Sequence, residues 1–248
     1  MKKLLSIFGV CSVVAASWWG FTVKSSDFMM AAIGDSMSTA FNADKDWNNL
    51  DLSWSAGENI ESHYTRLVAK FPDRNIRVIN LAVPGVDSSD IERQARDASR
   101  VELDYATILI GSNDLCRGLE SIDTFRDRMI SAIGILIKKS PGIKILLSST
   151  PNIVQAREVA SSLTSKRVWS KVMERCDVSD TDRFYEGWWK LNAVLDVIAQ
   201  NNEQVKYSDG VMLRDIEVDS ISEIDCFHAN IHGQEAIAEI TWAQGWFK

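Results

Sequence analysis

Four short polar motifs, spread along the chain, contain the residue types that acyl transfer requires. A serine hydroxyl attacks a carbonyl when a base takes its proton, a further group orients that base, and fixed donors receive the oxyanion. The motifs predict Ser36 as the nucleophile, His228 as the base and Asp225 as the group that orients it. The Ser36 and Gly85 N–H groups and the Asn113 side chain are the expected oxyanion hole. The motifs are Gly34-Asp35-Ser36, Asn80-Leu81-Ala82-Val83-Pro84-Gly85, Gly111-Ser112-Asn113-Asp114 and Asp225-Cys226-Phe227-His228.

Each motif alone has an ordinary structural explanation. Gly-Asp-Ser makes a good turn or helix cap, Asn113 is a residue type that ties down loops, and Gly85 after Pro84 fits a simple turn. We expect Ser36 to lie in a strand-to-helix turn, with its N–H facing the start of the helix. The hypothesis of a catalytic site therefore depends on whether the four motifs meet in space.

The three histidines narrow the choice of base. Asp225 and His228 are three residues apart, a spacing that lets a carboxylate reach the imidazole and fix its tautomer. His63 lies in an amphipathic segment and is interpreted as structural, whereas His232 is the alternative base but has no carboxylate three residues before it. Asp225, His228 and His232 could also be metal ligands, because two histidines four residues apart share a helix face. A third convincing ligand is missing elsewhere in the sequence, and we predict no metal site.

Short apolar runs alternate with amphipathic segments along the chain, which predicts a parallel sheet covered by helices on both faces. The motifs around Ser36, Gly85 and Asn113 each follow a predicted strand, and ligands meet parallel sheets at the carboxyl ends of the strands. The irregular stretch 152–182 is interpreted either as an insertion that shapes a substrate cleft or as an ordinary helix and loop. The predicted strands are 28–33, 76–83, 106–110, 143–148 and, more weakly, 205–212, and the predicted helices are 58–70, 89–99, 122–139, 183–201 and 233–244.

The composition favours a globular enzyme and argues against a nucleic-acid-binding protein. The chain has 248 residues, of which 46% are hydrophobic and 25% charged, as in an ordinary globular enzyme. The net charge of −7 and the lack of a basic cluster interleaved with aromatic residues argue against a nucleic acid partner.

The first residues predict export. Lys2 and Lys3 precede an uncharged run, 4–23, which fits either a cleaved signal peptide or a retained membrane anchor. We therefore divide the chain into an export segment, 1–26, and one domain, 27–248, that faces out of the cytoplasm in a periplasmic, extracellular or cell-surface location.

Export would allow the cysteines to form a disulfide, because exported domains meet an oxidising environment. Cys11 lies in the export segment, so the domain has three cysteines and at most one internal disulfide. Cys116 with Cys176 is the favoured pair, because Cys226 lies within the predicted catalytic loop.

As an ordered set, the four motifs resemble those of the SGNH/GDSL family of serine esterases and lipases, from about Phe28 to the C-terminus. Ser36, Gly85, Asn113 and His228 stand where the four signature residues of that family stand. A closer similarity, to the phospholipase B-like branch, is carried by Ser53-Trp54-Ser55-Ala56-Gly57, Ser62-His63-Tyr64-Thr65-Arg66-Leu67, Asn113-Asp114-Leu115-Cys116 and the Asp225 to His228 motif. Met37, where the family often has leucine, and Ala229, where proline commonly follows the base, depart from the pattern without removing a reacting group.

The resemblance implies a flavodoxin-like three-layer α/β/α sandwich with a mostly parallel sheet of about five strands. It also implies hydrolysis of carboxylic esters, with acyl esters of lipids or phospholipids as the expected substrates and contact with a membrane surface left open. A side-chain triad needs no cofactor, and none is expected. The alternatives are an acyltransferase or carbohydrate O-deacetylase that uses the same site, and a catalytically inactive binding module with the same fold.

Overall fold

The computed structural model describes residues 27–45, 47–160, 176 and 178–248. The predicted export segment, 1–26, lies outside the described residues, as do 161–175 and 177 of the irregular stretch. Within the described part of the chain, no helix is both long enough and apolar enough to cross a bilayer. The boundary at residue 26 stays a prediction.

Five parallel strands form the central sheet in the order β2-β1-β3-β4-β5. Every residue of β3 is buried, as expected of a strand that is covered on both faces. The predicted α/β fold with a parallel five-stranded sheet is confirmed. The strands are β1 (Phe28–Gly34), β2 (Ile76–Asn80), β3 (Tyr105–Leu109), β4 (Lys144–Ser148) and β5 (Val205–Ser208).

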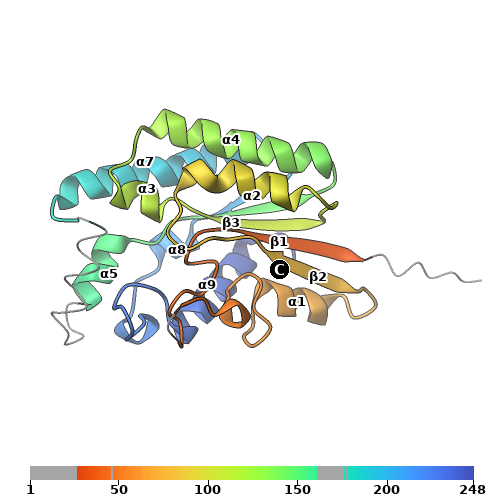
Figure 1. Cartoon of the computed structure of the whole chain (residues 1–248), viewed down its shortest axis with the longest axis horizontal. Helices are drawn as coiled ribbons and strands as arrows, with labels where there is room; N and C mark the ends of the chain where they lie inside the picture. Colours follow the sequence, from red (N-terminus) through yellow and green to blue (C-terminus); the bar gives the residue numbers. More distant parts are fainter. Residues whose placement is uncertain (1–26, 46, 161–175, 177) are drawn as a thin grey trace, which may run out of the picture.

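Helices cover both faces of the sheet, which gives three layers (Figure 1). On one face lie α2 (Ile91–Ala98), α4 (Ile122–Lys139) and α7 (Thr181–Gln200), and on the other lie α1 (His63–Lys70) and α9 (Ile231–Gln244). The shorter elements are α3 (Ser112–Cys116), α5 (Ile153–Ala160), α8 (Gly210–Leu213), η1 (Leu50–Leu52), η2 (Ser88–Asp90) and η3 (Val218–Ser220).

Side-chain alternation along the strands divides the core into two layers. Ala31 and Ile33 of β1 face the larger cluster, which includes Met129 of α4 and Leu191 of α7. Phe28, Met30 and Tyr105 face the smaller cluster, against which Trp242 packs from α9. Both faces of the sheet are thus sealed, and only the ends of the strands remain for a site.

Most predicted elements are observed near their expected bounds, with three differences. The run 205–212 is a strand only to Ser208, because Gly210–Leu213 forms the short helix α8. The first predicted helix begins at His63 rather than residue 58, because the Ser62 hydroxyl accepts from the Thr65 N–H and caps the helix there. Strand β2 ends at Asn80 rather than 83.

The expectation that a helix follows Ser36 is wrong. Residues 36–42 form consecutive turns, in which the Phe41 N–H donates to the Ser36 carbonyl over 3.0 Å. The Ser36 N–H therefore does not lie at a helix N-terminus.

Strand register explains why distant motifs meet. Strand β1 lies between β2 and β3, so the chain leaves β1 and β3 in opposite directions across the sheet and opens a crevice between them. Gly34 at the end of β1 is the register partner of Leu109 at the end of β3. Ser36 lies two residues after Gly34, and Asn113 lies four residues after Leu109.

Candidate active site

Gly34 closes β1 in a conformation that only glycine fits. Its φ is +147°, and a Cβ on it would lie 2.1 Å from the Leu109 carbonyl oxygen. The Gln94 side chain of α2 holds both backbone groups of Gly34, accepting from its N–H over 2.8 Å and donating to its carbonyl over 2.9 Å. This fixes the backbone two residues before Ser36.

The structure brings Ser36, His228 and Asp225 together. His228 Nε2 lies 2.8 Å from Ser36 Oγ, and His228 Nδ1 lies 2.6 Å from Asp225 Oδ2. With Nδ1–H donating to the carboxylate, Nε2 is left as the acceptor for the serine proton. The arrangement is that of a nucleophile, a general base and an orienting acid.

The loop from Asp225 to His228 is held by its own carboxylate. Asp225 Oδ1 accepts from the backbone N–H groups of Phe227 and His228, each over 3.0 Å. Cys226 between them has a φ of +56°, and its thiol is free and buried. The left-handed turn at Cys226 brings the two N–H groups back to the carboxylate.

Asn42 is a site residue that the sequence did not indicate. Its Nδ2 donates to Asp225 Oδ2 over 2.7 Å, so this carboxylate oxygen receives both an amide and the imidazole. Asn42 has a φ of +57°, which Asn adopts more readily than most residues, and its Oδ1 accepts from the Trp47 N–H. Asparagine favours turns, and Asn42 lies six residues after Ser36, but nothing in the sequence pairs it with Asp225.

The environment of Asp225 favours its charged form. Burial raises the pKa of Asp225, but the hydrogen bond and charge of His228, the backbone N–H of His228 and the Asn42 amide outweigh it, so that the pKa lies below its usual value. The carboxylate is thus ionised at neutral pH, as a partner for an imidazolium must be.

Two backbone donors are free at the site. Among the described residues, neither the Ser36 N–H nor the Gly85 N–H has a protein acceptor. Gly85 has a φ of +77°, a conformation that strains other residues, and it is exposed. Both N–H groups remain available to an oxyanion.

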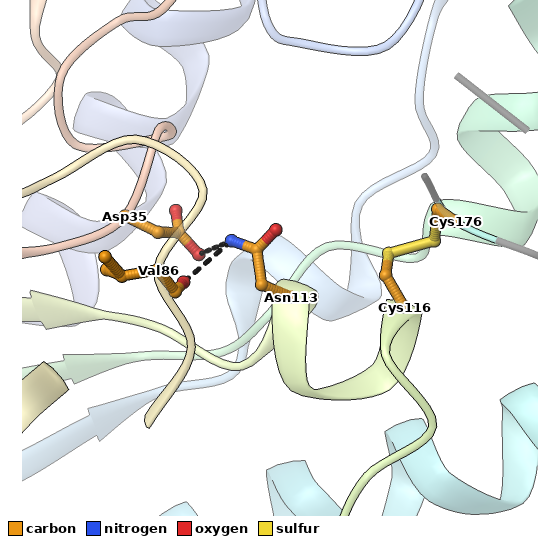
Figure 2. The surroundings of a disulfide bond; sticks show 5 residues. All are labelled: Asp35, Val86, Asn113, Cys116 and Cys176. Carbon is orange, nitrogen blue, oxygen red and sulfur yellow. Dashed lines mark hydrogen bonds between the residues drawn. A yellow bond between two sulfur atoms is a disulfide. The ribbon is translucent and has the colours of Figure 1, made fainter. Parts of the chain in front are cut away.

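Asn113 takes a different orientation (Figure 2). Its Nδ2 donates to the Val86 carbonyl over 2.8 Å and makes a longer contact of 3.5 Å with Asp35 Oδ2. Asn113 lines the same pocket as Ser36 and His228. The amide therefore lies beside the nucleophile, with one hydrogen used to fix the loop after Gly85 and the other only weakly engaged.

Helix α3, which carries Asn113, also holds the rest of the Gly85 loop. Arg117 donates to the Gly85 carbonyl over 2.6 Å and pairs with Asp87. Asp114 accepts from the Ser88 N–H over 2.9 Å and from its hydroxyl over 2.5 Å. These four contacts together hold the loop that carries the Gly85 N–H.

A disulfide anchors α3 at its other end. Cys116 is bonded to Cys176, the pairing expected from the sequence (Figure 2). The sulfurs join residues separated by 60 positions in the chain. The helix that supports the expected oxyanion hole is thereby tied to the segment that precedes α7.

Asp35 is a buried carboxyl group next to the nucleophile. Burial raises its pKa to about 7, against the opposing effects of the Met37 N–H, which donates to Oδ1 over 2.9 Å, and the charge of His228. Asp35 thus changes charge near neutral pH within contact distance of Asn113.

An apolar pocket with a cavity volume of about 70 Å³, partly open to solvent, adjoins the triad. Ser36 and His228 line it, and apolar side chains from α5, α8, α9 and the loop before His228 form most of its wall. Helix α9 contributes Gly233, Ile237 and Ile240, which lie on one helical face. The other apolar wall residues include Ile153, Ala156, Val211, Ile216 and Ile221.

The remaining histidines lie away from this chemistry. His63 is buried, with Nδ1 and Nε2 each 2.8 Å from the hydroxyls of Tyr105 and Thr241. His232 is exposed near the start of α9. No group of three or more His, Cys, Asp or Glu residues within the described ranges is placed to hold a metal ion.

The residues of the phospholipase B-like similarity between 53 and 67 support the fold. The Ser53 hydroxyl donates to the Ser38 carbonyl over 2.8 Å, and the Trp54 N–H donates to Gln234 over 2.9 Å. None of the described residues in this range lines the pocket. They contact the turn after Ser36 without lining the pocket, and so stabilise that turn.

Comparison with known proteins agrees with the observed fold. Solved structures with a similar fold include a lipase from a goat rumen metagenome (TM-score 0.62, 15% identity, covering 89% of this chain and 100% of that chain). They also include a catalytic variant of an acetylxylan esterase from Geobacillus stearothermophilus (TM-score 0.58, 16% identity, 89% and 95%) and TesA (TM-score 0.52, 16% identity, 87% and 97%). No curated protein matches the sequence significantly. Because residues 32–236 match the GDSL-like lipase/acylhydrolase family, the chain belongs to that family.

Proposed function

We propose that the protein is an exported serine esterase that hydrolyses carboxylic esters, in particular acyl esters of lipids or phospholipids, through an acyl-enzyme on Ser36. One observation carries the proposal: Ser36 Oγ and His228 Nε2 lie 2.8 Å apart, and both residues line an apolar pocket. Membership of a family of lipases and acylhydrolases supports it.

In the proposed reaction, His228 Nε2 takes the proton of the Ser36 hydroxyl as Oγ attacks the ester carbonyl. The tetrahedral intermediate collapses when the imidazolium gives this proton to the leaving alcohol oxygen. Water then attacks the acyl-enzyme, again with His228 as base, and releases the carboxylic acid. Asp225 stays ionised and stabilises the imidazolium, as its lowered pKa permits.

The oxyanion would be received by the free N–H groups of Ser36 and Gly85. The second hydrogen of Asn113 Nδ2, which makes only the 3.5 Å contact with Asp35, would be the third donor, while the first hydrogen stays on the Val86 carbonyl. Donors that are fixed before the reaction stabilise the charge without reorganisation cost at the transition state.

The pocket favours an acyl chain over a sugar. Its wall is mostly apolar, with isoleucine the commonest residue, and it would leave many hydroxyls of a carbohydrate without hydrogen-bond partners. The phospholipase B-like similarity also points to lipid esters, although its residues between 53 and 67 support the fold rather than the pocket.

Two features support export and contact with a membrane surface. The Cys116–Cys176 disulfide is typical of proteins outside the cytoplasm. Trp47 and Leu213, on segments near the triad and the pocket, are 66% and 63% exposed, and large apolar side chains at such positions suit a lipid interface. Cell fractionation with the intact mass of the recovered protein tests export and decides between cleavage and anchoring.

A substrate panel tests the reaction. Lysophospholipids, phospholipids, triglycerides and acetylated xylooligosaccharides are assayed with the wild type and with Ser36→Ala, with and without an added alcohol as acyl acceptor. We expect hydrolysis of lipid esters and a loss of roughly a thousandfold or more in Ser36→Ala. Preference for the acetylated sugars would overturn the lipid assignment, and acyl transfer to the alcohol in preference to water would overturn hydrolysis.

A further inference from the structure

The apolar pocket beside Ser36 contains one permanently charged side chain among the described residues that line it, Arg214. Arg214 follows α8 as its C-cap residue, and its N–H donates to the Gly210 carbonyl over 3.0 Å. The short helix thus fixes the backbone from which the arginine side chain reaches the wall.

The guanidinium group of Arg214 has no ion-pair or hydrogen-bond partner within the described part of the chain. The adjacent carboxylate, Asp215, accepts instead from Gln155 over 3.2 Å. A guanidinium presents five donors, and placing it at an apolar wall without a partner is unfavourable unless a ligand or water supplies acceptors.

The rest of the described lining is compatible with an anion. It contains no carboxylate, so a negatively charged group in the pocket would meet no like charge on its wall. Arginine binds phosphate and carboxylate through two parallel hydrogen bonds, which are stronger than neutral ones.

We propose that Arg214 selects ester substrates that carry an anionic group, a phosphate or a carboxylate, a few bonds from the scissile ester. This inference rests on the proposed esterase activity and adds to it the chemical class of the substrate. The apolar wall receives the acyl chain, and Arg214 receives the anion.

Two other roles for Arg214 are distinguishable from this one. The aliphatic stem alone could cover the apolar wall, with the charge in solvent. The charge could also offset Asp215, Glu217, Asp219 and Glu223, which crowd the same loop. In the first case the rates on neutral and anionic esters would change together. In the second case Arg214→Lys, which keeps the charge, would retain the full preference for anionic esters.

A matched set of three octanoyl esters tests the proposal: octanoylglycerol phosphate, the octanoyl ester of glyceric acid, and neutral octanoylglycerol. In Arg214→Met, which keeps the stem but not the charge, kcat/KM should fall about 10- to 100-fold on the anionic esters, mainly through KM, and change less than about threefold on octanoylglycerol. Arg214→Lys should retain part of the preference, because lysine keeps the charge but not the paired geometry. Arg100→Met, which removes an exposed charge that follows the end of α2, should leave the preference unchanged.

The ratio of kcat/KM on two esters, measured on one sample, does not depend on how much of a variant is folded. A fall in the ratio for the phosphate ester alone, or for the carboxylate ester alone, supports the proposal and identifies the anion. An unchanged ratio in Arg214→Met, with octanoylglycerol still hydrolysed, would overturn the role of Arg214 and leave the esterase proposal standing. Failure of the wild type to hydrolyse any of the three esters, as in Ser36→Ala, would overturn both.

Discussion

Asn42 Nδ2 lies 2.7 Å from Asp225 Oδ2, so the turn that begins at Ser36 also orients the carboxylate that orients His228. Nucleophile and acid are 189 positions apart in the chain, yet this one amide ties the two halves of the triad together. The turn after Ser36 therefore does more than expose a hydroxyl.

This contact predicts a catalytic cost for Asn42 variants. Asn42→Gly tolerates the φ of +57° but removes the amide, and kcat on a nitrophenyl ester should fall about tenfold with KM unchanged. Asn42→Asp keeps an acceptor for the Trp47 N–H but places a second carboxylate against Asp225, and should lose more activity than Asn42→Gly. Activity near that of the wild type in Asn42→Asp would show that only the loop conformation matters.

Asn113→Ala should reduce kcat about 100- to 1000-fold, because it removes the proposed side-chain oxyanion donor. It also removes the bond to the Val86 carbonyl, so a control must separate these effects. Arg117→Met loosens the same loop, through the Gly85 carbonyl, without removing an oxyanion donor, and should cost less than about tenfold. Equal losses in the two variants would assign Asn113 to loop support alone.

Much of the fold followed from the sequence because buried parallel strands are near-continuous apolar runs with turn residues at their ends. The long helix α4 was predicted at its observed bounds, 122–139, because apolar positions repeat along it at three- and four-residue steps. In the structure Ser121 caps its start. The short helix α8 was missed because Val211 and Met212 continue the apolar run of β5, and a run of this length does not separate strand from helix.

The site was less predictable than the fold. Ser36, Asp225 and His228 came from residue types and spacing, but the partners of Asp225 and Asn113 depend on tertiary contacts. Asn42 reaches Asp225 only because the chain turns after Ser36 instead of forming a helix. Arg214 had no sequence signal, because its importance comes from lining a pocket built by α5, α8 and α9.

Buried His63 predicts an acid-dependent loss of stability. Burial, with a smaller effect of Arg66, lowers its pKa from 6.5 to about 3, so the unfolded chain binds a proton between these values that the folded protein does not. The free energy of unfolding should therefore fall as pH falls from 6.5 toward 3, by up to about 1.4 kcal/mol per pH unit from this group. Urea unfolding of the wild type and His63→Gln across this pH range checks the prediction. The destabilisation caused by His63→Gln should shrink as the pH falls. His232→Gln, which removes an exposed histidine, is the control and should show no such change. A constant difference between wild type and His63→Gln would contradict the assignment.

Asp35 predicts a pH dependence of opposite sign. Its pKa is raised from 3.8 to about 7 by burial, so the folded protein holds a proton that the unfolded chain has lost. Its contribution to stability is complete below about pH 4 and is lost as pH rises to about 7. Asp35→Asn has no charge to lose, so its stability relative to the wild type should improve from pH 4 to pH 8, as measured by urea unfolding. A relative stability that does not change with pH would contradict a raised pKa at Asp35.

The central claim, that His228 activates Ser36 as a nucleophile, is tested most directly by the rate and site of labelling with a fluorophosphonate probe, read by peptide mass spectrometry. The wild type should form one adduct, on Ser36; Ser36→Ala should form none; and His228→Ala should react with Ser36 at least about a hundredfold more slowly, because the base is gone. Absence of an adduct on the folded wild type, or equal labelling rates with and without the His228 imidazole, would contradict the account and favour a binding module that retains the fold.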